Sequence, residues 1–173
     1  MKNNKSNESV PEILYIAYGS NLNLSQMQQR CPTARVIGAL EIKDYELVFR
    51  GSRYSAVGTI EPCEGSNVPI LLWGIQPEDE KSLDRYEGYP NFYEKENMEI
   101  VLNGRTVSAM VYVMTHGHEL GIPSERYKRS IEDGYMDAGF DTDILQNAVD
   151  KTKVKMQEVM NDIDEQESLF GMK

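Results

Sequence analysis

The residues Tyr18-Gly19-Ser20-Asn21 have the types and spacing of an anion-binding turn. They end a short apolar run, and a polar, amphipathic segment follows from Leu24. A glycine turn lets the backbone approach a ligand closely, while the free N–H groups and the dipole of a helix start favour negative charge. The alternative is an ordinary strand-to-helix connection in which Ser20 or Asn21 caps the helix.

Glu87 has sequence surroundings that should perturb a carboxyl group. It is expected to be the last residue of a helix, and aromatic residues lie on both sides of it. The negative end of the helix dipole and partial burial both disfavour a carboxylate, so we expect a raised pKa. Such a carboxyl can take and return a proton near neutral pH. The alternative is a solvated acid at a helix end, which is the usual state of a glutamate.

Two other groups of residues could carry chemistry, but the His116/His118 pair is interpreted as part of a solvated loop and Cys31 as structural. His116 and His118 lie two residues apart in a turn, but the sequence near them offers no third ligand of the kind that a catalytic zinc needs. Cys31 lies at the C-terminal end of an expected helix, whereas thiolates are stabilised at N-terminal ends. We therefore predict no metal site.

Composition excludes several classes of function. The chain has 173 residues, a formal net charge of −10 and two cysteines. A strongly acidic chain lacks the basic patch that nucleic acids or anionic membranes require, and no apolar run is long enough to span a bilayer. The first residues are polar and lack the apolar core of a signal peptide. We expect a cytoplasmic protein with neither nucleic-acid nor membrane partners.

The elements that must position these residues follow from apolar patterning and breakers. Pro77, followed directly by three acidic residues, predicts a helix start, and Gly88 predicts the end of that helix. Asn103-Gly104 is the preferred two-residue type I′ hairpin turn. The pattern predicts strands over residues 13–18, 35–40, 45–50, 56–61, 68–75, 96–102 and 106–114, and helices over 24–30, 77–87, 124–137 and 142–169.

These elements indicate an α+β domain built on a largely antiparallel sheet or small barrel. We expect a disordered lead-in over residues 1–12, a domain over 13–140 and a helical extension over 141–173. Apolar residues recur in the extension at helical spacing. We interpret this stripe as a packing face and as a candidate contact for a homodimer.

Two motifs together resemble a known family. YIAYGSNLN at residues 15–23 and LDRYEGYPNFY at residues 83–93 are similar to the γ-glutamylcyclotransferase-like family, which includes γ-glutamylamine cyclotransferases and AIG2-like proteins. The resemblance covers about residues 14–140. It implies a small mixed β-barrel flanked by helices. One departure is Tyr86, where some members carry glutamine.

The resemblance also implies a reaction and a set of site residues. The α-amine of a small γ-glutamyl substrate would attack its own γ-carbonyl, which releases 5-oxoproline and an amine or amino acid without a cofactor. Glu87 would be the general acid/base, and the γ-glutamyl group would be held by Tyr18, Gly19, Ser20, Asn21 and Leu22, with Tyr93, Tyr112 and Tyr127 around the pocket.

The leaving group stays open at this point. Amino acids, amines, glutathione-like peptides and a biosynthetic intermediate could all carry the same γ-glutamyl group. Two other functions also remain as alternatives. One is a non-catalytic module of the same fold that binds a small anion, and the other is an interaction protein that uses its C-terminal helix.

Overall fold

The computed structural model describes residues 12–171, and its centre is one mixed sheet of five strands. The strand order is β2-β3-β1-β5-β4, in which β1 pairs in parallel with β5 and every other neighbouring pair is antiparallel. This confirms the α+β class and the largely antiparallel sheet. The strands are β1 (Ile13–Ala17), β2 (Arg35–Arg50), β3 (Val57–Ile75), β4 (Tyr93–Leu102) and β5 (Arg105–Met114).

The prediction of more than five strands was wrong because two expected breaks lie inside long strands. β2 and β3 pair along most of their length, with a register shift between Lys43 and Tyr45. Asp44 has a positive φ of 61°, and its Oδ1 accepts a hydrogen bond of 2.9 Å from the backbone N of Gly65. The turn-forming residues therefore make an irregularity in a continuous ladder, not a chain reversal.

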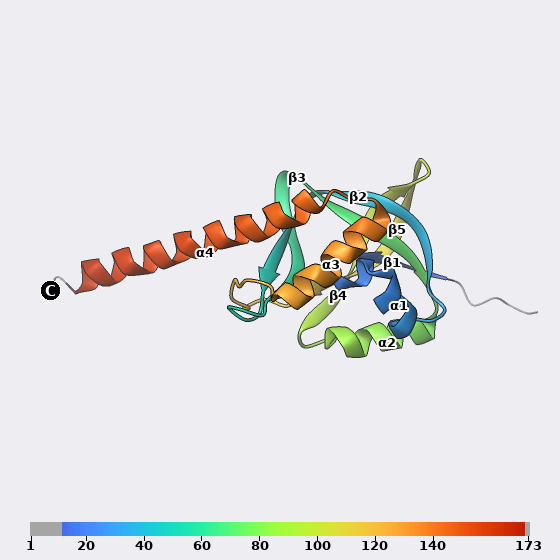
Figure 1. Ribbon diagram of the computed structural model, residues 1–173, viewed down its shortest axis with the longest axis horizontal. Coiled ribbons are helices and arrows are strands. Elements are labelled where there is room, and N and C mark those ends of the chain that lie inside the picture. Colours follow the sequence, from blue (N-terminus) through green and yellow to red (C-terminus); the bar gives the residue numbers. More distant parts are fainter. Residues whose placement is uncertain (1–11, 172–173) are drawn as a thin grey trace, which may run out of the picture.

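The sheet curls but does not close into a barrel (Figure 1). Its two edge strands are β2 and β4, and a cavity of about 820 Å³ lies between them. Closure would require a continuous ladder of backbone hydrogen bonds between these edges. Apolar side chains instead line the space between them, among them Leu40, Ile42, Met98, Ile100 and Phe140.

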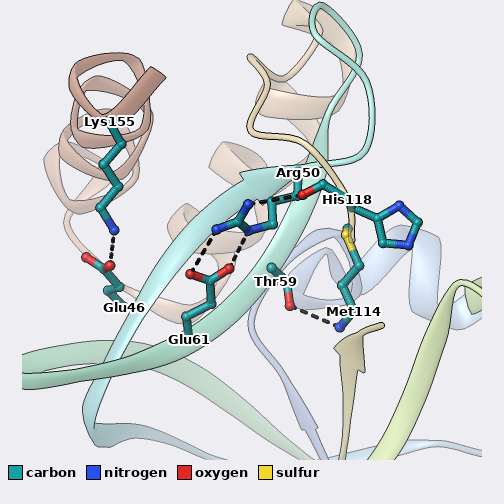
Figure 2. Close-up of polar contacts among 7 residues, drawn as sticks. All are labelled: Glu46, Arg50, Thr59, Glu61, Met114, His118 and Lys155. Carbon is teal, nitrogen blue, oxygen red and sulfur yellow. Dashed lines mark hydrogen bonds and ion pairs between the residues drawn. The ribbon is translucent and has the colours of Figure 1, made fainter. Parts of the chain in front are cut away.

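Side-chain contacts hold neighbouring parts of the curled sheet together, as Figure 2 shows. Arg50 on β2 pairs with Glu61 on β3, and its Nη1 donates a hydrogen bond of 3.0 Å to the carbonyl of His118. Thr59 Oγ1 accepts a hydrogen bond of 3.0 Å from the backbone N of Met114. This last bond joins β3 to β5, which are not neighbours in the sheet.

The helices are η1 (Ser20–Leu22), α1 (Leu24–Arg30), α2 (Pro77–Glu87), α3 (Glu125–Ala138) and α4 (Thr142–Phe170). The predicted bounds of α2 are confirmed. It begins with a reciprocal capping box between Gln76 and Asp79, and Gly88 ends it in the left-handed conformation with φ 64°. The Asn103-Gly104 hairpin is also confirmed, with positive φ at both residues.

α4 extends well beyond the rest of the molecule (Figure 1). Its first turns pack against the body through buried Leu145, Val149 and Thr152. Lys155 pairs with Glu46 of β2 (Figure 2), and most of the later residues are exposed. None of the helices within residues 12–171 has the length and apolarity needed to cross a membrane.

The lead-in predicted over residues 1–12 lies almost wholly outside the described residues. Glu12 is the exception, and its carboxylate accepts hydrogen bonds from Arg35 Nε at 2.6 Å and from Arg35 Nη2 at 2.5 Å.

Candidate active site

After β1 the chain passes through Tyr18 and Gly19 into a single 3₁₀ turn, η1, before α1 begins. Asn23 is the N-cap of α1, because its side chain accepts a hydrogen bond of 3.0 Å from the backbone N of Gln26. The alternative in which Ser20 or Asn21 caps the helix is therefore excluded. The side chains of Ser20 and Asn21 instead hydrogen-bond to residues around the pocket: Ser20 to Tyr86, and Asn21 to Tyr15 and Glu87.

Asn21 joins the loop directly to Glu87. Its Nδ2 donates hydrogen bonds to Glu87 Oε1 at 3.0 Å and to the hydroxyl of Tyr15 at 2.8 Å. Its Oδ1 accepts from Arg30 Nη1 at 2.5 Å. A guanidinium can only donate, so Arg30 fixes which end of the amide faces Glu87. The backbone carbonyl of Asn21 is held in turn by Trp73 Nε1 at 3.1 Å.

Glu87 is the last residue of α2 and is partly buried at the inner end of this network. Burial raises the pKa of its carboxyl from 4.5 to about 7. The charge of Arg30 and the hydrogen bond from Asn21 both act in the opposite direction. Desolvation outweighs them, so the carboxyl can be present in either protonation state near neutral pH.

Tyrosine rings form the walls of the pocket around Glu87. The hydroxyl of Tyr93 donates to the Gly58 carbonyl at 2.6 Å, and the hydroxyl of Tyr127 accepts from the Gly58 N–H at 3.0 Å. Tyr112 is anchored from outside by a bond of 2.6 Å from its hydroxyl to Asp84 Oδ1. Burial raises the pKa of each of these three phenols, so they remain neutral donors at neutral pH.

The structure brings together most of the residues singled out from the sequence. The pocket is lined by Tyr18, Gly19, Ser20, Asn21, Glu87, Tyr93, Tyr112 and Tyr127. Leu22 does not line it, because its side chain is fully buried in the core next to Gly134. The same 3₁₀ turn therefore directs its polar side chains to the pocket and its leucine to the core.

Sequence reasoning missed two residues that line the pocket and one that acts behind it. Tyr15 and Gly58 are lining residues, and Arg30 orients Asn21. Tyr15 is three residues before Tyr18, but nothing in a buried strand marks which face meets a site. Gly58 is a strand residue whose position follows only from the curl of the sheet.

The pocket itself is small, at about 30 Å³, but a cavity of about 510 Å³ adjoins it. Ser20 and Tyr127 line both spaces and form part of the wall between them. A larger cavity of about 770 Å³ lies on another part of the molecule, where its Arg50 and Glu61 already pair with each other. The perturbed carboxyl and the converging donors favour the Glu87 pocket as the site.

Several known proteins resemble this chain in sequence and in fold. Residues 15–134 match the family described as gamma-glutamyl cyclotransferase, AIG2-like. The human protein named gamma-glutamylcyclotransferase is 29% identical over 132 residues, which cover 68% of this chain and 67% of that protein. Its bovine counterpart is 28% identical over 127 residues, with the same coverage of both chains. A solved structure named gamma-glutamyl cyclotransferase superposes with a TM-score of 0.71 at 25% identity, covering 80% of this chain and 86% of that one.

Proposed function

The chain belongs to the AIG2-like γ-glutamyl cyclotransferase family and is an enzyme of this kind, and on that premise we propose that Glu87 is its general acid/base in the release of 5-oxoproline from a γ-glutamyl amide. The observation that carries the proposal is the Glu87 carboxyl itself. It is desolvated, its pKa is raised to about 7, and it is held against the Tyr18–Asn21 loop by Asn21.

The reaction needs a carboxyl that both takes and returns protons. The substrate's α-ammonium loses a proton to Glu87, and its nitrogen forms a bond to the γ-carbonyl carbon. The bond from that carbon to the leaving nitrogen then breaks. Protons removed from the α-nitrogen are returned to the leaving nitrogen, so Glu87 ends in its starting state and no water is consumed. A general acid/base of this kind contributes roughly 10²–10⁴-fold.

The other pocket residues would bind and orient the substrate. Ring closure joins two atoms of the same molecule, so fixing the folded conformer can supply on the order of 7–11 kcal/mol. The hydroxyls of Tyr127 and Tyr15 accept hydrogen bonds from the Gly58 N–H and from Asn21 Nδ2 and keep their own protons. Together with the polar groups of the loop, they can donate to the substrate's α-carboxylate and to the developing oxyanion. The pocket of about 30 Å³ is smaller than such a substrate, so part of the substrate would lie in the adjoining cavity, whose lining includes Ser20 and its partner Tyr86, 3.0 Å apart between their oxygens.

The test is 5-oxoproline release from γ-glutamyl substrates by wild type and Glu87→Gln. We expect wild-type activity and at least a hundredfold loss in the variant, because glutamine keeps the shape but cannot exchange a proton. Glu78→Gln, on the exposed face of the same helix, is the matched control and should stay active. Wild-type rates in Glu87→Gln would show that the acid/base is another group. Tight substrate binding without product in wild type would indicate a binding module.

A further inference from the structure

The cavity next to the Glu87 pocket has an electrostatic character opposite to that of the whole chain. Its charged lining residues are Arg30 and Arg126, and no carboxylate lines it. The chain as a whole carries a net charge of −10. Two cations and no carboxylate in its lining make the cavity a local site that favours a negatively charged group, although the field of the whole chain opposes anions.

The two arginines differ in whether their side chains are held by other residues. The Arg30 guanidinium is fixed by hydrogen bonds to Asn21 Oδ1 at 2.5 Å and to Gln26 Oε1 at 2.8 Å, and it stacks over the Tyr86 ring at 3.6 Å. Arg126 lies in the first turn of α3 and is exposed, and none of the described residues hydrogen-bonds to its side chain or pairs with it. One cation is therefore a fixed part of the cavity, and the other is available to a ligand.

The position of this cavity relative to the acid/base identifies the part of the substrate it would receive. Ser20 and Tyr127 line both the cavity and the Glu87 pocket. The Glu87 pocket, at about 30 Å³, is too small for a whole γ-glutamyl amide, and this cavity adjoins it, so the cavity is the space open to the group attached to the γ-carbonyl. We propose, on the basis of the proposed function, that this cavity is the leaving-group subsite and that Arg126 selects leaving groups bearing a carboxylate over neutral or cationic amines.

The test compares two substrates that differ only in that carboxylate, γ-glutamyl-alanine and γ-glutamyl-ethylamide. Wild type should favour γ-glutamyl-alanine in kcat/KM, and high salt should reduce the preference because this charge is exposed to solvent. In Arg126→Gln the preference should fall about fivefold, chiefly through KM, which is the scale of one exposed ion pair. The ethylamide has no carboxylate for Arg126 to contact, so its kcat/KM should fall much less than that of γ-glutamyl-alanine.

Matched variants separate this role from a general effect of charge. Arg129→Gln removes an exposed arginine of α3 that does not line the cavity and should keep the full preference. Arg126→Lys should keep part of it. An unchanged preference in Arg126→Gln would overturn the subsite while the proposed function stands. Absence of 5-oxoproline from both substrates in wild type would overturn the proposed function and the subsite with it.

A separate observation concerns the exposed half of α4. Residues Leu145, Val149 and Thr152 face the body and are buried. The same spacing of four and three residues continues through Met156, Val159, Ile163, Gln166 and Phe170. This is the heptad seam of a coiled coil, yet Val159 and Ile163 are each 50% exposed and Phe170 is 77% exposed.

We infer that this seam pairs with α4 of a second copy, in antiparallel orientation. The body already covers the seam up to Thr152, so a parallel partner would bring two bodies to the same end of the helix pair. An antiparallel partner puts them at opposite ends and sets Val159 against Ile163 of the second copy. It also places each Lys153 beside Glu167 of the second copy and brings the two Asp162 side chains together, whereas a parallel pair would place Asp162 beside Glu167 twice and would form no Lys153–Glu167 pair.

The exposed seam has the length of about two heptads, so we expect a reversible dimer that depends on concentration. Sedimentation of the full chain should show a species of twice 19.7 kDa that dissociates on dilution. Ile163→Asp should abolish it, and Val154→Asp, which is exposed but off the seam, should not. Reversing the charge pair by Lys153→Glu should weaken the dimer, and adding Glu167→Lys should restore it. A monomer at all concentrations would overturn the inference.

Discussion

The side-chain amide of Asn21 donates to Glu87 Oε1 at 3.0 Å while its oxygen accepts from Arg30 at 2.5 Å. Asn21 thus links a cation to a carboxyl: Arg30 orients the amide so that its N–H group points at Glu87. The hydrogen bond stabilises the ionised carboxylate and opposes desolvation, which is the larger effect. The pKa of Glu87 is therefore set by two opposing effects. Weakening the contacts with Asn21 or Arg30 should raise it, and weakening the desolvation should lower it.

The first prediction concerns that balance. Wild-type kcat/KM should fall below about pH 7, where Glu87 takes up a proton and can no longer act as a base. Asn21→Ala removes a group that lowers the pKa of Glu87, so the acidic limb should move to higher pH. The pH–rate profile measures this. Asn67→Ala, at an exposed position outside the site, should leave the limb in place, and an unmoved limb in Asn21→Ala would contradict the assignment.

The second prediction concerns the join between α3 and β3. The Tyr127 hydroxyl accepts from the Gly58 N–H at 3.0 Å, and Gly58 also accepts from Tyr93 through its carbonyl. Tyr127→Phe leaves a buried backbone donor without its partner, which costs about 1–3 kcal/mol. Urea unfolding should show this loss. Tyr54→Phe is the control, since Tyr54 is 71% exposed, and it should unfold like wild type.

The third prediction concerns the ion network behind Tyr112. Lys95 pairs with Glu80 at 2.6 Å and with Asp84 at 2.7 Å, and Asp84 accepts from Tyr112. Lys95→Met leaves two partly buried carboxylates without their cation and should destabilise the fold by about 1–3 kcal/mol. Lys81→Met breaks an exposed pair with Glu78 and should cost less than about 0.5 kcal/mol. Equal midpoints in urea for the two variants would contradict this account.

The sequence predicted those parts of the fold and site that depend on local rules. Pro77, Gly88 and Asn103-Gly104 determine their own backbone geometry, and the structure agrees at each. The Asp44 and Gly65 breakers have the same local character, but two long strands pair across them. Whether such residues reverse a chain or only bend it depends on partners elsewhere.

The same division applies to the site. The loop and Glu87 are recognisable as a pair of motifs, but the role of Arg30 depends on a contact nine residues away through the Asn21 amide. The directions of the η1 side chains, toward the pocket for Ser20 and Asn21 and toward the core for Leu22, also depend on tertiary contacts. Ser20 and Asn21 point to the pocket because Asn23 supplies the cap of α1. All three are residue types that can cap a helix and lie within four residues of Leu24, and the structure shows that Asn23 is the one that does so.

The last prediction concerns folding stability as a function of pH. Glu87 has a pKa of about 7 in the folded state and 4.5 as its ordinary value, so between these pH values the folded chain binds more protons than the unfolded chain. Stability from this group is therefore fully present below pH 4.5 and is lost as the pH rises through about 7. The total is about 3 kcal/mol at most.

Glu87→Gln cannot ionise and should lack this contribution to the pH dependence. We expect the variant to gain stability relative to wild type as the pH rises from 4.5 to about 7, with the difference constant above and below that window. Urea unfolding of both proteins across this range measures it, and subtracting the two curves cancels the titration of the remaining acids. Glu78→Gln should parallel wild type throughout. A constant difference between Glu87→Gln and wild type across the window would show that Glu87 titrates alike in both states, and the site would lose the property that suits it to proton exchange.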